Sequence, residues 1–290
     1  MKQTTAQIHQ AIADKVIDSM KTLGSSWSKS WSTPSGLMPT SMSTNKPYNG
    51  INLLILGLTR ATENYSSNEW ATYNQWSKRN AQVIKGEKAT TVIFFKPLII
   101  KDKADGEEKT IPLMRTFSVF NACQVSGYES AATVTIDPNT QPVTLADDFA
   151  ASVGADVRHS DVTSAFYVPS KDFINVPFAT QFGSEEAYAT TLLHELTHWS
   201  GAKSRCNRNL LNTFGTKDYA KEELVAELGA AMLAGSLAVS MVPRDDHAKY
   251  LNSWIKRLGE DPSIIFSAAA KASQAARWLT DTSEPAAIAA

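Results

Sequence analysis

The sequence predicts an α+β protein of two domains, an N-terminal mixed α/β domain and a C-terminal domain with two strong helices. The chain has 290 residues, 43% of them hydrophobic, which is enough apolar material for two ordinary domains. Strand-like and helix-like segments both occur along it. Its charge is also divided. Residues 1–130 carry 15 Lys and Arg against 10 Asp and Glu, whereas residues 131–290 carry 13 against 19.

The N-terminal half alternates helical and extended segments. Apolar residues recur at helical spacing from Ile8 to Met20 and predict a helix over residues 5–23. Beyond a Ser-rich loop, residues 45–50 predict a turn, residues 51–58 predict a buried helix, and Trp70, Tyr73 and Trp76 follow at helical spacing. Residues 83–88 then predict a glycine turn. Residues 90–95 and 117–121 predict two strands, which pair across a charged hairpin at residues 101–109.

The domain boundary is predicted at residues 131–142, where a Thr-, Asn- and Pro-containing stretch separates two more regular regions. The expected domains are therefore residues 1–130 and 143–290. No run of about 18 apolar residues and no signal pattern occurs, so we expect a cytoplasmic protein with no membrane partner. The two cysteines, Cys123 and Cys206, are far apart and predict neither a disulfide framework nor a zinc-thiolate site.

Residues 194–198 read His-Glu-Leu-Thr-His, an HExxH sequence within an apolar, helix-compatible stretch from about residue 187 to residue 199. Two histidines four residues apart lie on one face of a helix. His194 and His198 can therefore bind one Zn²⁺ ion, with Glu195 directed into the same cleft. This is the arrangement that a zinc metallopeptidase requires.

Such a site needs a third protein ligand and keeps a fourth position for water. Residues 221–233 predict a helix on which Glu223 and Glu227 share a face. The pattern resembles that of gluzincin-like peptidases, in which a later glutamate binds the metal and an acid one turn on orients a ligand histidine. That resemblance makes Glu223 the ligand and Glu227 the orienting acid. The competing ligand candidates are Glu222, Glu227, His159 and His247.

A hydrolytic mechanism follows from these residues. Zn²⁺ lowers the pKa of a bound water towards about 7, and Glu195 takes the proton of that water and returns it to the leaving amine. Residues 165–169 and 173–177 predict two strands, and a strand beside the active-site helix could bind an extended peptide. Tyr167, on the first strand, is a candidate oxyanion donor, although packing within the strand explains it more simply.

Aromatic residues interleaved with Lys and Arg in the N-terminal half form the pattern of a single-stranded nucleic-acid surface, because rings stack on unpaired bases while cations follow the phosphates. The candidate residues are Trp27, Trp31, Lys46, Tyr48, Trp76, Arg79, Lys85 and Lys88. Core packing stays open as the alternative for each aromatic residue.

Several motifs resemble ArdC-type antirestriction proteins of conjugative plasmids. Residues 45–52, 70–73, 83–88 and 119–122 are similar to the N-terminal domain of that family, and residues 192–199, 204–208 and 222–233 to its zincin-like metallopeptidase domain. The matches keep the order of the family from about residue 5 to residue 235. The resemblance implies a single-stranded DNA-binding domain followed by a zinc peptidase domain. It also implies that the chain protects incoming plasmid DNA from host restriction.

Two alternatives remain open at this point. Protection could come from occlusion of single-stranded DNA alone, with a structural zinc site. Alternatively, the chain could be a DNA-dependent protease that acts on DNA-bound proteins, with host restriction proteins among the possible substrates. In each case single-stranded DNA is the expected partner.

Overall fold

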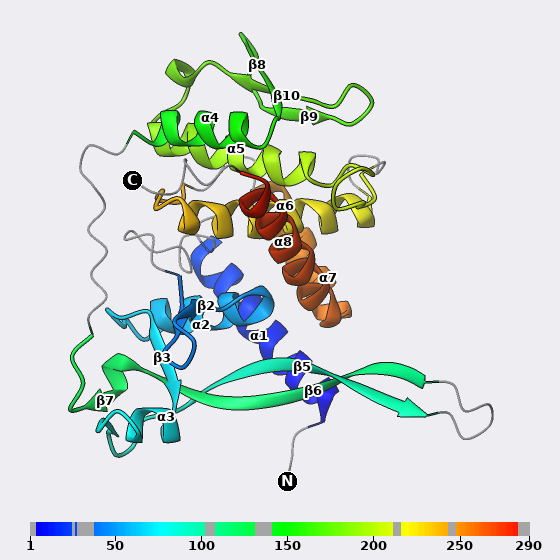
Figure 1. Cartoon of the computed structure of the whole chain (residues 1–290). Helices are drawn as coiled ribbons and strands as arrows, with labels where there is room; N and C mark the ends of the chain where they lie inside the picture. Colours follow the sequence, from blue (N-terminus) through cyan, green and yellow to red (C-terminus); the bar gives the residue numbers. More distant parts are fainter. Residues whose placement is uncertain are drawn as a thin grey trace.

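The computed structural model describes residues 4–24, 27, 38–101, 108–130, 141–210, 216–242 and 248–283 (Figure 1). It confirms the α+β class. The five-stranded sheet belongs to the first 130 residues, in the lower half of the view, and layered helices with a small sheet form the upper half. Within the described ranges, no helix is both long and apolar enough to cross a membrane.

The sheet of the N-terminal half has the strand order β2-β1-β3-β6-β5. Its strands are β1 (Thr40–Ser41), β2 (Lys46–Pro47), β3 (Glu69–Thr72), β5 (Thr90–Lys101) and β6 (Glu108–Asn121). The predicted pairing of β5 with β6 is confirmed. They run antiparallel from the Thr90 and Val119 pair to the Lys101 and Glu108 pair, and both are longer than predicted. The hairpin that joins them, at residues 102–107, lies outside the described residues.

Two helices belong to this half, and α2 packs against β5. α1 (Thr5–Leu23) is confirmed in full. It begins with a capping box between Thr4 and Gln7, and its apolar stripe from Ile8 to Met20 is buried. α2 (Gly50–Thr62) is longer than the predicted 51–58. Asn52 of α2 donates a hydrogen bond to the Ile93 carbonyl at 2.6 Å and accepts one from the Ile93 amide at 2.7 Å. α2 therefore occupies the open edge of β5 at this position.

The helical spacing of Trp70, Tyr73 and Trp76 is misleading, because Trp70 lies in β3 and the helix α3 (Tyr73–Ser77) begins only at Tyr73. Thr72 caps that helix. Its hydroxyl accepts a hydrogen bond from the Gln75 amide at 3.3 Å, and the Gln75 side chain accepts one from the Thr72 amide at 2.8 Å. This capping box fixes the start of the helix at Tyr73. Three short elements follow in this half: β4 (Gln82–Val83), η2 (Ala122–Gln124) and β7 (Val125–Ser126).

The C-terminal half begins with α4 (Pro142–Ser152), which starts at the last position of the predicted linker. Residues 131–140 of that linker lie outside the described residues. A three-stranded sheet of order β8-β10-β9 follows. β9 (Phe166–Val168) and β10 (Phe173–Pro177) are the two predicted strands, and they pair antiparallel. β8 (Asp156–Ser160) was not predicted and runs parallel to β10. β9 is therefore an edge strand.

Helices form the remainder of this half. After η3 (Ala179–Gln181) come α5 (Glu185–Trp199), α6 (Lys217–Ser236), α7 (Ala248–Glu260) and α8 (Ser263–Thr282). The first two contain and extend the predicted helices, and the last two were not predicted. α5 and α6 approach closely at Gly229, where an added Cβ would lie 2.5 Å from Cγ2 of Thr197. Glycine at this position lets the backbone of α6 lie against the HExxH helix.

One hydrophobic core joins α1 and α2 to α5, α6, α7 and α8. The fully buried rings of Trp27 and Trp254 lie 6.0 Å apart within it, and the Gly50 amide at the start of α2 donates a hydrogen bond to Ser273 of α8 at 2.6 Å. The C-terminal helices thus pack back onto the N-terminal ones.

Candidate metal centre

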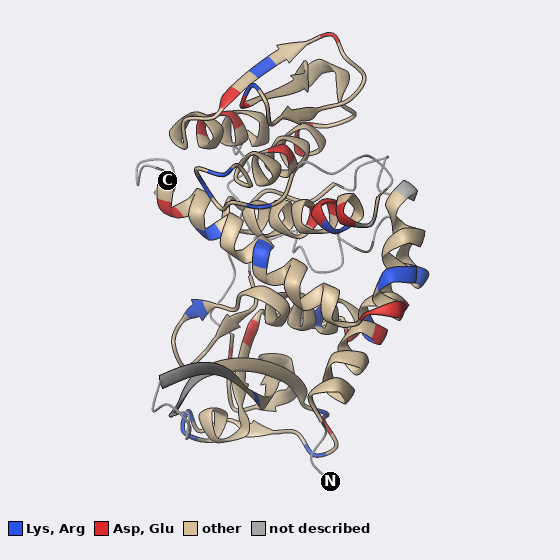
Figure 2. Cartoon of the chain, turned by 90° about the vertical axis from the view of Figure 1, so that its right-hand side faces the viewer, with Lys and Arg blue, Asp and Glu red and all other residues tan. Residues whose placement is uncertain are grey.

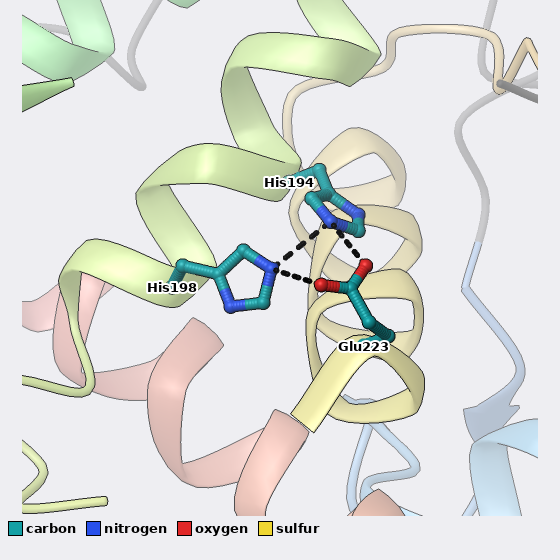
Figure 3. Close-up of side chains that lie close together, drawn as sticks. All are labelled: His194, His198 and Glu223. Carbon is teal, nitrogen blue, oxygen red and sulfur yellow. Dashed lines mark hydrogen bonds and ion pairs between the residues drawn. The ribbon is translucent and has the colours of Figure 1, made fainter. Parts of the chain in front are cut away.

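The HExxH residues lie in the last two turns of α5 (Figure 3). Ser184 caps this helix by accepting a hydrogen bond from the Ala187 amide at 3.2 Å. The acidic residues in the first turn interact favourably with the positive end of the helix dipole. The helical repeat directs His194 and His198 to one side, where their Nε2 atoms are 3.1 Å apart. His194 is 2% exposed, so the pair is held within a packed environment.

Glu223 of α6 completes a group of three possible metal ligands. Its Oε2 lies 3.5 Å from Nε2 of His194 and its Oε1 lies 3.5 Å from Nε2 of His198. One ligand atom from each residue lies within 4.8 Å of the other two. Ligand atoms around tetrahedral zinc, each at 2.0–2.2 Å from the metal, are about 3.3 Å from one another. The donor types and their spacing therefore fit a divalent metal ion.

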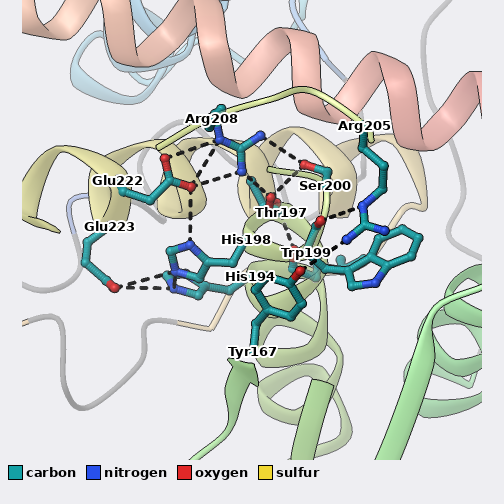
Figure 4. Close-up of polar contacts among 11 residues, drawn as sticks. Tyr167, His194, Thr197, His198, Trp199, Ser200, Arg205, Arg208, Glu222 and Glu223 are labelled. Atoms are coloured by element: carbon teal, nitrogen blue, oxygen red, sulfur yellow. Dashed lines mark hydrogen bonds and ion pairs between the residues drawn. The ribbon is translucent and has the colours of Figure 1, made fainter. Parts of the chain in front are cut away.

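The other ring nitrogens face two further carboxylates, of which Figure 4 shows Glu222 beside His198. Nδ1 of His198 lies 3.3 Å from Oε1 of Glu222, and Nδ1 of His194 lies 3.8 Å from Oε2 of Glu227. Arg208 donates to both Glu222 oxygens at 3.0–3.2 Å. Each imidazole thus has a carboxylate on the side opposite Glu223, an arrangement that fixes ring orientation in metal sites. Sequence reasoning treated Glu222 only as a competing ligand.

Buried carboxylates and imidazoles shift one another's pKa values. Burial lowers the pKa of His198, but hydrogen bonds with Glu222 and Glu223 outweigh it and raise the pKa to about 10. Burial raises the pKa of Glu223, but hydrogen bonds with the two histidines outweigh it and hold that pKa well below its usual range. The pKa of Glu222 is lowered in the same way, against burial, by His198 and Arg208. The cluster therefore favours positive charge at its centre.

A groove of about 1340 Å³ opens over the cluster and is lined by His194, Glu195, His198 and Glu223. Glu195 is 3% exposed. Tyr219 and Tyr250 line the same groove, with their hydroxyls 3.5 Å apart. The Tyr219 hydroxyl also hydrogen-bonds Glu223, and its pKa is raised by burial and by that carboxylate. The groove thus contains two hydroxyl groups that sequence reasoning missed.

Tyr167 lines the groove as well, but other groups engage its hydroxyl. It donates to Asp172 at 2.7 Å and accepts from Arg205 at 3.2 Å. Burial and the Asp172 carboxylate raise the pKa of Tyr167 to about 12. Arg205 also stacks over the Trp199 ring, 3.8 Å from its centroid. These contacts connect the β9–β10 hairpin to the end of α5. They favour the structural role for Tyr167 over the role of oxyanion donor.

The remaining ligand candidates lie elsewhere. Nε2 of His159 hydrogen-bonds the Tyr188 hydroxyl at 2.7 Å, and His247 lies outside the described residues. Sequence reasoning also missed Arg208. The one signal for it is its place in the segment 204–208, which carries part of the family resemblance.

The structure corrects the prediction of an aromatic stacking surface. Trp27 and Trp76 are 0% exposed and Tyr48 is 9% exposed, so their rings cannot stack on bases. Trp76 instead donates a hydrogen bond to the Phe120 carbonyl, and Arg79 donates to the Met42 carbonyl. Of the other candidates, Lys46, Lys85 and Lys88 are exposed, and Trp31 lies outside the described residues. Core packing, the alternative left open for each aromatic residue, therefore holds for Trp27, Tyr48 and Trp76.

Comparison with known families agrees with the fold and the site. Residues 144–271 match the zincin-like metallopeptidase domain MPTase-PolyVal, and residues 6–120 match the N-terminal domain of the anti-restriction factor ArdC. The chain is thus a two-domain protein with a zincin-like metallopeptidase domain. Crystal structures of the antirestriction protein ArdC from plasmid R388, one metal-free and one Mn(II)-bound, are 37% identical to it in sequence. The match has a TM-score of 0.79 and covers 95% of this chain and 97% of that one. The chain belongs to the ArdC family of antirestriction proteins.

Other relatives show where this unit occurs. Protein y4eC of Sinorhizobium fredii is 36% identical over 96% of this chain and 92% of its own length. A DNA primase TraC of Escherichia coli is 34% identical over 94% of this chain, but the match spans 27% of that primase. Almost the whole of this chain thus corresponds to a part of a longer protein.

Proposed function

We propose that this chain is an antirestriction protein that binds single-stranded DNA and hydrolyses peptide bonds at a zinc site. The observation that carries the catalytic part is the cluster of His194, His198 and Glu223 at the floor of the groove, with spacings close to the edges of a metal tetrahedron. The DNA-binding part is supported by the match of residues 6–120 to the ArdC N-terminal domain.

His194, His198 and Glu223 would hold the metal, and Zn²⁺ is the ion we expect for two imidazoles and one carboxylate. When bound, such an ion supplies a Lewis acid that polarises a carbonyl and lowers the pKa of water towards about 7. Glu222 and Glu227 hold the two imidazoles in the orientation that directs Nε2 to the centre.

Glu195 has the role of general base. It lies on α5 between the two histidines and lines the groove. It takes a proton from the attacking water and delivers it to the amine leaving group as the peptide bond breaks. Tyr219 and Tyr250 line the same groove and are candidates, beside Tyr167, to donate to the developing oxyanion. The Tyr219 hydroxyl lies next to the ligand set, because it hydrogen-bonds Glu223, whereas the Tyr167 hydroxyl contacts Asp172 and Arg205.

The substrate would lie along β9, the edge strand of the small sheet. Among the described strands, β9 has a partner on one side only, and through Phe166 and Tyr167 it also lines the groove. An extended peptide can add to such an edge by main-chain hydrogen bonds. We propose that substrates are proteins bound to the incoming DNA, since a domain that holds the strand raises the local concentration of peptidase beside it.

A Glu195→Gln variant tests the proposal. We expect it to bind metal with unchanged stoichiometry, to lose peptide hydrolysis, and to lose protection of conjugated DNA in a restricting recipient. Glu185→Gln is the matched control, because Glu185 is exposed in the first turn of the same helix. Full protection by the Glu195→Gln protein would show that occlusion of DNA is sufficient and that proteolysis is not the mechanism.

Metal analysis tests the site itself. Purified wild-type protein should contain about one zinc ion per chain. His194→Ala should remove it, whereas His159→Ala, the same substitution outside the cluster, should not. Equal metal content in both variants would contradict the ligand assignment.

A further inference from the structure

The exposed aromatic side chains of the N-terminal half differ from those that the sequence pattern indicates. Within the described residues 38–101 and 108–130, the exposed rings belong to Tyr73, Phe94, Phe95 and Phe117, which are 45–56% exposed. Three of these four lie on β5 and β6, the long strand pair along the lower edge of the molecule in Figure 1. An exposed ring on a strand is a common platform for unpaired bases.

The strand register places two of the rings on one face. Phe94 lies opposite Arg115, and Val92 lies opposite Phe117. Residues opposite each other in an antiparallel pair, and residues two apart along a strand, point to the same side. Phe94, Arg115 and Phe117 therefore share one face, and Phe95 lies on the other.

These side chains form one surface, which we call the β5–β6 aromatic patch: Phe94, Leu113, Arg115 and Phe117. The rings of Phe94 and Phe117 contact each other, with centroids 5.4 Å apart, and Leu113 is 36% exposed on the same face. Behind the patch, Tyr48 lies 6.4 Å from the Phe94 ring and packs in a core with Val92 and Val119. The patch is thus exposed but rests on a packed base.

The charge of these strands fits a polyanion. The strands β5 and β6 contain four basic residues, Lys96, Lys101, Lys109 and Arg115, and one acidic residue, Glu108. The whole chain, by contrast, has 28 basic and 29 acidic residues. Among the described side chains, Arg115 lies on the same face as Phe94 and Phe117. A cation beside exposed rings provides the two interactions that single-stranded nucleic acid requires.

Addition of a peptide strand is a less suitable use of this region. β5 is the edge of its sheet, but Asn52 already hydrogen-bonds both the amide and the carbonyl of Ile93. The main chain is thus occupied at this position, while the ring of the next residue, Phe94, is 45% exposed. The face of the strand pair, rather than its edge, is open to a partner.

We propose that the β5–β6 aromatic patch is the surface on which this chain holds single-stranded nucleic acid. Phe94 and Phe117 stack on bases, and Arg115 pairs with a phosphate. The inference rests on the proposed function, in that it gives the DNA-binding activity a location.

The test is binding of a fluorescent oligothymidylate of about 16 nucleotides to the full chain. We expect Phe94→Ala and Phe117→Ala each to weaken binding on the order of tenfold, and the double variant more strongly still. Phe95→Ala and Tyr73→Ala are the matched controls, since both rings are exposed, one on the opposite face of β5 and one on α3. Both controls should stay within about twofold of wild type, which is the usual effect of a surface substitution.

Arg115→Ala should lower the slope of log affinity against log salt by about 0.7, the contribution of one phosphate contact on a single strand. All altered side chains are exposed, so thermal unfolding should match wild type and separate loss of binding from loss of fold. A double variant that binds like wild type, or controls that weaken equally, would overturn the patch while leaving DNA binding intact. A wild-type chain that does not bind the oligonucleotide would overturn both the patch and the proposed function. A change in oligomeric state in the double variant, with DNA binding unaltered, would identify the patch as a contact between copies and refute the inference.

Discussion

Replacing Gly229 with alanine should separate the two helices that form the metal centre. An alanine Cβ would lie 2.5 Å from Cγ2, 2.8 Å from Oγ1 and 3.2 Å from Cβ of Thr197. Carbon atoms in contact prefer about 3.5–4.0 Å, so the nearest pair is about 1 Å too close. Thr197 cannot rotate away freely, because it is fully buried and its hydroxyl donates to the Leu193 carbonyl at 2.9 Å.

The expected loss of stability is about 2 kcal/mol. Overpacking at a rigid contact costs up to about 3 kcal/mol, and the better helix propensity of alanine offsets about 1 kcal/mol of that. For a chain of 290 residues the shift corresponds to roughly 3 °C in Tm. Metal affinity should fall on the order of tenfold to a hundredfold, because a displacement of Glu223 by about 1 Å far exceeds the tolerance of about 0.2 Å in a metal site.

Thermal unfolding and metal titration of a variant set measure both effects. Gly235→Ala, on the same helix, faces only the flexible side chain of Met38 at 3.3 Å and should be nearly neutral. Adding Thr197→Ala to Gly229→Ala removes both nearest contacts, and a double-mutant cycle should show a favourable coupling of about 1 kcal/mol or more. A Gly229→Ala protein with the Tm and metal affinity of wild type would refute the reasoning, as would a coupling of zero.

Three further outcomes are expected. Arg208→Lys removes the bidentate contact with Glu222 and should weaken metal binding about tenfold, as measured by titration calorimetry. Arg158→Lys is the control, because Arg158 lies in an exposed ion pair, and it should leave the affinity unchanged. Equal affinities of the two variants would contradict a positioning role for Arg208. When a chelator has removed the metal, the free energy of unfolding should decline as pH rises. The pKa of His198 is about 10 in the folded chain and about 6.5 in the unfolded chain. The stabilisation that protonated His198 provides is therefore complete below about pH 6.5 and is lost towards pH 10. Melting curves of His198→Gln should lack that decline, and an unchanged decline would assign it to other groups. Chelator should lower the Tm of wild type but not of His194→Ala, and a similar loss in both proteins would show that the stabilising ion binds elsewhere.

The parts of the fold that the sequence predicts are those with local signals. The capped, periodic helix at residues 5–23 and the strands β5 and β6 follow from residue patterns alone, as do His194 and His198 at helical spacing. Glu223 could be selected only by analogy, because three acids on α6 share a similar sequence setting. Long-range contacts separate them: Glu222 pairs with Arg208, Glu227 approaches Nδ1 of His194, and Glu223 faces both Nε2 atoms.

The positions of the aromatic residues could not be predicted from the sequence. A buried and an exposed tryptophan have the same letter in the sequence, and only the tertiary partner decides between them. Trp27 is covered by Trp254, which is more than two hundred residues away in the chain, and Trp76 lies against Tyr128. Helices α7 and α8 were missed, and without them the core position of Trp27 could not be inferred.

The return of α7 and α8 onto α1 and α2 gives the two halves a common hydrophobic core. A truncation between them would strip apolar faces from both pieces, so each fragment would be prone to aggregate rather than behave as an independent module. The stretch shared with TraC spans nearly this whole chain, so sequences similar to both halves occur together in that longer protein.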